Sequence, residues 1–328
     1  MQHANKVKTA LALLTLILLS SALPELTTSS TLSSDFFRPS VFFILLIFGY
    51  GIPILLIREC AVRFHLNYFG LFLFGIAFGL YSEGFIAKTL ILSTSLPSAA
   101  YNNYGYYFGV SIPFAIAISI WHAIASVVLP VFFTHHLFPE KRGVTWLPKW
   151  LTILFSFGIM GIGIANLLNP NIRVAGTIPA LVLLLSSMLI LIFLGFRYGK
   201  RVLPERQKSV PSYPVKPLRP FYIGFFTIFY FAFNFVAVLH LPVVIFCGLL
   251  IASIYYYYKK YSPQIITEGD YLMFGFGFYV QQALLAILIR LMGGGLSATA
   301  SITPLFIFIA ITIFYVRKRT KVASNQQP

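Results

Sequence analysis

Ten apolar stretches, separated by short polar segments, constrain this chain more than any other feature of its sequence. They cover residues 9–23, 40–57, 67–92, 110–133, 150–168, 177–196, 221–239, 241–258, 271–291 and 299–316. A helix needs about 20 apolar residues to cross the hydrocarbon core of a bilayer. Because only 10% of the residues are charged, a soluble fold of this length is excluded. We therefore predict an all-α, polytopic transmembrane helix bundle with about ten spans.

The polar segments are too short to hold a soluble domain, so we predict one transmembrane domain over residues 1–328. The longest of them, residues 199–219, is basic and rich in proline. Such a segment is a semi-extended linker that can lie against anionic lipid headgroups. The lipid bilayer is the predicted partner. The net charge of +16 does not indicate nucleic acid, because the basic residues lie in short loops between apolar stretches.

The distribution of Lys and Arg predicts the orientation. With the N-terminus inside, 20 of the 24 basic residues fall in inside segments, and Arg58 and Lys141 are among them. The four on the outside are Arg38, Lys88, Arg173 and Arg290. Basic residues are enriched in inside loops of membrane proteins. We therefore predict a multi-pass protein of the cell membrane with both termini inside.

The first stretch leaves two alternatives open. This stretch is short, and Lys6 and Lys8 precede it. Its residues Ser20-Ser21-Ala22 are similar to the small-residue cleavage site at the end of a signal peptide. A cleaved signal peptide and a signal anchor share these features. The number of spans is nine in the first case and ten in the second.

Glu83 is the acidic residue that the sequence places within a span. Gly75, Gly79 and Glu83 are spaced four residues apart, so the three lie on one helix face. Small residues at this spacing let another helix approach closely, which directs Glu83 into the bundle. An ionisable residue in a span is a functional candidate, here a proton carrier, ion ligand or catalytic acid. The alternative is a structural pair with a cation on a neighbouring helix or with Lys88.

His122 is the corresponding candidate in the next span. Ser111, Ser119 and Ser126 share its helix face and form a polar stripe. A histidine side chain suits proton transfer because it changes protonation near neutral pH. The alternative is a buried hydrogen bond between helices. Because consecutive spans are antiparallel, Glu83 and His122 could meet within the bundle.

Other polar residues are weaker candidates. The neutral amides Asn234, Gln281 and Gln282 either contact a substrate or join helices through hydrogen bonds. At the inner end of the second span, Glu59 and Arg63 are spaced i, i+4 and predict an ion pair, although Glu59 could instead face an inner vestibule.

We read the adjacent His135 and His136 as interfacial residues. The sequence contains no phosphate-binding glycine loop, no zinc-protease His-Glu-x-x-His pattern and no nucleophile elbow. We therefore predict no metal and no cofactor.

Three short strings together resemble an uncharacterised group of prokaryotic multi-pass membrane proteins. They are Arg58-Glu59 with Arg63, Glu83-Gly84 with Lys88, and Trp121-His122 with Ser126 and Pro130. The resemblance covers roughly residues 45–145 and implies a membrane protein without implying an activity.

A looser similarity is to the CAAX-protease-like intramembrane enzymes, which would make Glu83 and His122 site residues. Here the chain departs from the family motif. Ser82 stands where the first glutamate of that motif belongs, and no further histidine string supplies a third metal ligand.

Three hypotheses for the function follow. We favour a transporter or permease-like protein with a polar intramembrane site, because such residues mark solute pathways. The second is an intramembrane enzyme, a CAAX-protease-like hydrolase. The third is a non-catalytic membrane accessory or assembly protein, in which the polar residues only join helices. The sequence indicates no substrate, and it favours a protein that is not an enzyme.

Overall fold

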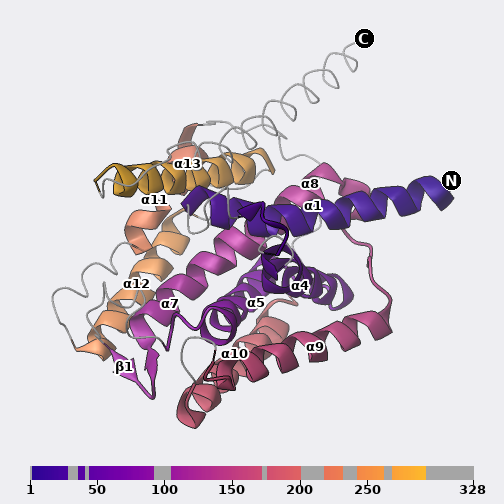
Figure 1. Cartoon of the computed structure of the whole chain (residues 1–328). Helices are drawn as coiled ribbons and strands as arrows, with labels where there is room; N and C mark the ends of the chain where they lie inside the picture. Colours follow the sequence, from indigo (N-terminus) through magenta and orange to yellow (C-terminus); the bar gives the residue numbers. More distant parts are fainter. Residues whose placement is uncertain are drawn as a thin grey trace. The chain divides into compact units, whose positions relative to one another are not determined.

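The structure is a computed structural model of the whole chain (Figure 1). It describes residues 2–28, 36–40, 44–91, 105–171, 176–200, 218–231, 242–261 and 268–292. These residues are mostly helical, as the apolar stretches predict. Five described helices are long and apolar enough to cross a membrane. They span Lys6–Thr28, Tyr68–Ile86, Ile112–Leu137, Lys149–Leu168 and Ile178–Tyr198.

The helical elements follow the predicted order. They are α1 (Gln2–Thr28), η1 (Ile44–Gly51), α4 (Ile52–Arg63), α5 (Tyr68–Leu80), η2 (Tyr81–Ile86), α7 (Ile112–His122), η3 (Ala123–Val128), α8 (Leu129–Leu137), η4 (Pro139–Lys141), α9 (Lys149–Leu168), α10 (Ile178–Tyr198), α11 (Leu218–Phe231), α12 (Val243–Tyr261) and α13 (Glu268–Met292). A two-stranded hairpin, β1 (Tyr106–Tyr107) and β2 (Val110–Ser111), precedes α7.

The chain forms two compact units. The first comprises Met1–Ser21, Pro39–Lys208 and Phe229–Tyr257, and the second comprises Ala22–Arg38, Ser209–Ile228 and Tyr258–Pro328. In the second unit, α11 and α13 cross closely through Gly224 and Gly277. An added Cβ at either glycine would lie about 2 Å from a carbonyl oxygen of the other helix, that of Phe274 or Phe221 respectively.

Helix α5 is the centre of the first unit. It packs against α4, α7 with η3, and α10 (Figure 1). Asn67 begins the helix as its N-cap, with a side chain that accepts from the Gly70 N–H at 3.0 Å. Thr177 caps α10 in the same way. By contrast, the outer sides of α9 and α10 expose large apolar side chains such as Phe157 and Phe193, as expected where helices face lipid.

Helices α4, α5, α8, α9 and α10 meet at one end of the first unit, which we call the basic end. The Asn67 N–H donates to the Gly199 carbonyl, just after α10, at 2.8 Å. The Glu59 carboxylate in α4 accepts from the Trp146 N–H, before α9, at 2.8 Å. The cationic side chains at the basic end are those of Arg63, Arg142, Lys149, Arg197 and Lys200. Successive helices therefore run antiparallel from α4 to α10.

The opposite end carries the β-hairpin, and we call it the hairpin end. The Ser111 N–H donates to the Leu90 carbonyl at 3.0 Å and joins β2 to the segment after η2. The Lys88 ammonium donates to the Asn169 carbonyl after α9 at 2.8 Å. These contacts fix the end of η2 against the end of α9.

Several predicted boundaries need correction. Helix α4 continues to Arg63, beyond the stretch 40–57, because the returning loop covers its last turn. Arg58, counted above as an inside-loop cation, is fully buried, and Lys141 is 3% exposed. Helix α1 extends on both sides of residues 9–23. The stretch 299–316 and most of the linker 199–219 lie outside the described residues.

Candidate functional site

Both helices that carry the candidate residues change to π-helical winding where those residues lie. Helix α5 continues as η2, which contains Glu83. Helix α7 ends at His122 and continues as η3, which contains Ser126. Single π turns inside helices occur frequently at functional sites. In each case the wider turn coincides with the polar group.

Glu83 and His122 contact each other across the two helices. The His122 Nε2 lies 3.0 Å from the Glu83 Oε1, so the contact that antiparallel spans allow is present. On the other side of the ring, Nδ1 lies 3.0 Å from the Ser126 Oγ. The His122 side chain is 1% exposed and that of Glu83 is 14% exposed.

This geometry suits more than one protonation state of the ring. In the neutral ring, Nε2–H donates to Glu83 and Nδ1 accepts from the Ser126 hydroxyl. In the imidazolium form, both nitrogens donate, and the Ser126 hydroxyl rotates to accept. The observed heavy-atom positions therefore satisfy the hydrogen bonds of either form of the ring.

Thr89 completes the coordination of the carboxylate. Its hydroxyl donates to the Glu83 Oε2 and also lies 3.3 Å from the Glu83 carbonyl oxygen. Both carboxylate oxygens therefore have a hydrogen-bond partner. Thr89 could not be identified from sequence spacing, because it follows the end of η2 by three residues and reaches Glu83 only after the chain turns.

Aromatic rings surround His122. The ring centroids of Tyr50, Phe78 and Trp121 lie 6.0, 5.6 and 4.8 Å from that of the imidazole. Such surroundings lower the local dielectric constant and strengthen hydrogen bonds within the site.

The close approach of the helices depends on two glycines. A Cβ added at Gly75 would lie 2.6 Å from the Ala123 Cα, and one at Gly79 would lie 2.4 Å from the Ser119 Cα. Ser119 is fully buried against Gly79, and its hydroxyl has no hydrogen-bond partner among the described residues. Its place is therefore in the helix contact, one turn from the Glu83–His122 pair.

Lys88 lies near the site at the hairpin end. Its side chain is fully buried, and its ammonium donates to the Asn169 carbonyl. Nearby, the Asn166 amide donates to the Phe85 and Ile86 carbonyls at 2.5 and 3.0 Å. Asn166 thus supplies a donor to two carbonyls at the end of the π turn, a role that sequence reasoning missed.

A second buried polar cluster, which we call the Arg58 cluster, lies at the basic end. The Arg58 guanidinium contacts the Glu59 Oε1 at 2.7 Å, the His135 Nε2 at 3.2 Å and the Lys141 carbonyl at 2.6 Å. It also stacks on Trp146, 3.6 Å from the ring centroid. The His135 ring is 8% exposed and accepts a hydrogen bond from Arg58, so it is buried within the protein at this end.

The predicted pair of Glu59 and Arg63 is present at 3.4 Å. However, Glu59 also pairs with Arg58 and accepts from the Trp146 and Leu147 N–H groups. It is fully buried and does not face a vestibule. These contacts attach the loop between α8 and α9 to α4, so the cluster is structural.

The remaining candidates belong to other parts of the chain. Gln281 and Gln282 are buried on α13 in the second unit, and each has a polar atom without a hydrogen-bond partner there. Asn234 lies outside the described residues. Within the part of the chain that the structure describes, no three His, Cys, Asp or Glu side chains are placed to hold a metal ion.

Comparison with known proteins agrees with the membrane character of the chain. Residues 13–210, which include Glu83 and His122, match a family described as an uncharacterized membrane protein family. No curated protein and no solved structure matches the chain. The resemblance to an uncharacterised group of membrane proteins is thereby confirmed. Because the match covers more than half of the 328 residues, the chain belongs to this uncharacterized membrane protein family.

Proposed function

We propose that this protein is a permease-like membrane protein in which Glu83 and His122 carry an exchangeable proton. The observation that supports the proposal is the 3.0 Å contact between the two side chains across adjacent helices. Ionisable residues inside spans mark proton and solute pathways in transporters. The π turns at Glu83 and after His122 are the kind of helix irregularity found at such sites.

We further propose about ten spans in the cell membrane, with both termini inside. Support comes from the gathering of Arg63, Arg142, Lys149, Arg197 and Lys200 at the basic end, which suits the inner face of a membrane. The basic linker 199–219 would then lie against anionic lipid headgroups.

Substitution of Glu83 by Gln tests the proton role. Gln keeps the size of the side chain but cannot bind and release a proton at neutral pH. Protein in proteoliposomes would be offered pools of amino acids, sugars, nucleosides and organic acids, and charge movement would be recorded on a solid-supported membrane. We expect one pool to produce a pH-dependent current in the wild type. In Glu83→Gln this current should fall about tenfold or more.

Glu140→Gln is the matched control, because Glu140 is exposed and pairs with Lys8 at 3.0 Å, away from the site. It should leave the current unchanged. A current with the same pH dependence in Glu83→Gln would exclude a proton role for Glu83. If no pool produces a current, and Glu83→Gln only lowers stability, an accessory or assembly role replaces the permease proposal.

One observation favours an enzyme as a second candidate. Ser126, His122 and Glu83 are hydrogen-bonded in the order serine, histidine, carboxylate of a serine hydrolase triad, although Ser126 contacts Nδ1 and Glu83 contacts Nε2, the reverse of the usual ring nitrogens. A hydrolase of this kind should react with a fluorophosphonate probe at Ser126, and Ser126→Ala should abolish the labelling. Ser119→Ala is the control, since Ser119 shares the helix but not the hydrogen bond. Absence of labelling in the wild type would rule out this candidate.

A further inference from the structure

The π-helical turn η2, which contains Glu83, ends a few residues after that carboxylate. The Ala87 N–H donates to the Ser82 carbonyl at 2.8 Å, and Lys88 then has a φ of 58°, so the chain leaves the helix there. The last carbonyls of a helix have no following turn that donates to them. Within a bilayer, each such group needs a partner inside the protein. The position of Glu83 therefore depends on what contacts the end of η2.

Helix α9 supplies this partner through Asn166. The Asn166 Nδ2 donates to the Phe85 carbonyl at 2.5 Å and to the Ile86 carbonyl at 3.0 Å. Both carbonyls belong to the end of η2, two and three residues after Glu83. An amide nitrogen carries two N–H donors, so one side chain can satisfy both carbonyls at once. Asn166 thereby attaches the end of η2 to α9.

Tyr81 makes a second contact with α9 at the beginning of η2. Its hydroxyl donates to the Ile159 carbonyl at 3.1 Å. The ring lies against Gly163, where an added Cβ would be 2.6 Å from the Tyr81 Cε2. The first residue of η2 and its last two carbonyls are thus attached to α9, and Glu83 lies between them in the sequence.

The Glu83 carboxylate itself contacts a different helix. Its Oε1 lies 3.0 Å from the Nε2 of His122, which ends α7. Hydrogen bonds lose their strength within a few tenths of an ångström beyond this distance. The contact between Glu83 and His122 therefore requires that η2 be held in place from the side of α9.

We propose that α9 positions Glu83 for its contact with His122, with Asn166 and Tyr81 as the positioning residues. The hydrogen bonds described above for these two side chains go to backbone carbonyls. The two residues therefore act on the site through the place of η2. Their effect on transport rests on the proposed function, whereas their effect on the distance between Glu83 and His122 does not.

The test replaces Asn166 by Leu, which has a similar size but no donor, and Tyr81 by Phe, which lacks only the hydroxyl. Full-length protein with ¹⁵N-labelled histidine is studied in nanodiscs by NMR between about pH 5 and 8. The His122 signals are assigned by their loss in His122→Gln. The current described under the proposed function is recorded over the same pH range.

In Asn166→Leu, the ring ¹⁵N shifts of His122 should differ from those of the wild type at equal pH. The pH profile of the current should be displaced, and its maximum should fall about tenfold, as loss of a hydrogen-bonded contact predicts. Tyr81→Phe should change both measurements in the same direction by a smaller amount, because Asn166 still holds the end of η2.

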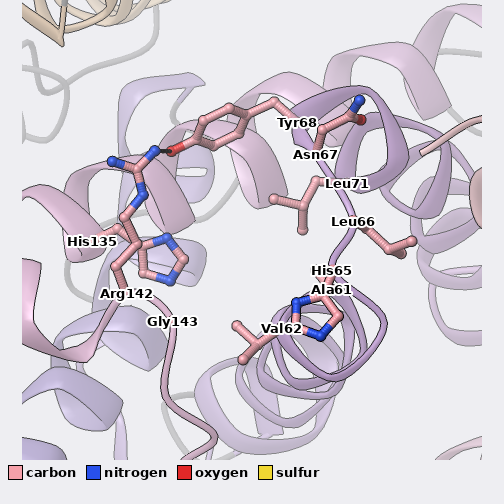
Figure 2. Close-up of a pocket in the computed structure, with 10 residues that line it drawn as sticks. All are labelled: Ala61, Val62, His65, Leu66, Asn67, Tyr68, Leu71, His135, Arg142 and Gly143. Atoms are coloured by element: carbon pink, nitrogen blue, oxygen red, sulfur yellow. Dashed lines mark hydrogen bonds between the residues drawn. The ribbon is translucent and has the colours of Figure 1, made fainter. Parts of the chain in front are cut away.

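Two control variants should leave the shifts and the current unchanged. Asn169→Leu removes an amide from the same end of α9 but keeps the backbone carbonyl that accepts from the Lys88 ammonium at 2.8 Å. His65→Asn is the distant control, and Asn tolerates the φ of 54° at this position. His65 lines a cavity of about 190 Å³ at the basic end, between the turn that joins α4 to α5 and the turn that follows α8 (Figure 2).

The outcomes separate this proposal from the proposed function. Altered His122 shifts in Asn166→Leu and Tyr81→Phe, in a protein that carries no current, support the positioning role while the permease function fails. Unchanged His122 shifts in both variants, or equal changes in Asn166→Leu and Asn169→Leu, would overturn the positioning role. If gel filtration shows that Asn166→Leu does not fold, Tyr81→Phe decides alone, since it keeps the ring and its packing.

Discussion

Replacement of Arg58 by Met is expected to lower the free energy of unfolding by about 3–5 kcal/mol, the range found when one partner of a buried ion pair is removed. Because the Met side chain is of similar length, the lost stability reflects mainly the missing charge and its hydrogen bonds, and only to a smaller extent a change in packed volume. The substitution leaves the fully buried Glu59 carboxylate without its 2.7 Å partner. It also removes the donors to the His135 ring and the Lys141 carbonyl.

The measurement is unfolding by SDS in mixed micelles, followed by circular dichroism. Arg63→Met is the control within the same cluster, because Arg63 is partly exposed and lies 3.4 Å from Glu59. It should cost about 1 kcal/mol or less. The double variant Arg58→Met with Glu59→Gln should recover part of the loss, since it also removes the unpaired charge. Equal stability of wild type and Arg58→Met would show that the cluster does not hold the loop.

The Arg58 cluster also shows where sequence reasoning failed. Arg58 follows an apolar stretch directly, which is where inside-loop cations normally lie. Its burial depends on the loop before α9, which returns and places Trp146 over the guanidinium. The one sequence feature that could have indicated this burial is a tryptophan, Trp146, in the short loop between Pro139 and Pro148. Nothing in the spacing, however, identifies which helix such a loop will cover.

The Glu83–His122 contact was more accessible to prediction. Helical periodicity puts Gly75, Gly79 and Glu83 on one face, and two consecutive spans must run in opposite directions. Together these facts place Glu83 toward the following helix, although they do not fix which residue it meets. The π turns could not be predicted, because they arise from a shift of one residue in backbone hydrogen bonding that side-chain spacing does not encode.

Replacement of Gly79 by Leu is expected to cost about 3 kcal/mol of stability, at the upper end of the usual range for overpacking. The reason is that an added Cβ would lie 2.4 Å from the Ser119 Cα. A backbone atom cannot move aside as the end of a side chain can, so α5 and α7 must separate. Gly158→Leu is the control, because among the described residues no atom beyond its own stretch of helix lies within 4 Å of its added Cβ. It should change stability by no more than about 0.5 kcal/mol.

The same substitution connects packing to the proposed function. Glu83 lies one helical turn beyond Gly79, and its 3.0 Å contact with His122 becomes too long for a hydrogen bond if the helices move apart by even 1 Å or so. The ¹⁵N chemical shifts of the His122 ring should therefore change in Gly79→Leu but not in Gly158→Leu. If Gly79→Leu loses the transport current but the His122 shifts stay unchanged, the helix contact supports transport by some means other than the Glu83–His122 hydrogen bond. If both shift and stability are unaffected, the close packing at Gly79 does not position the site.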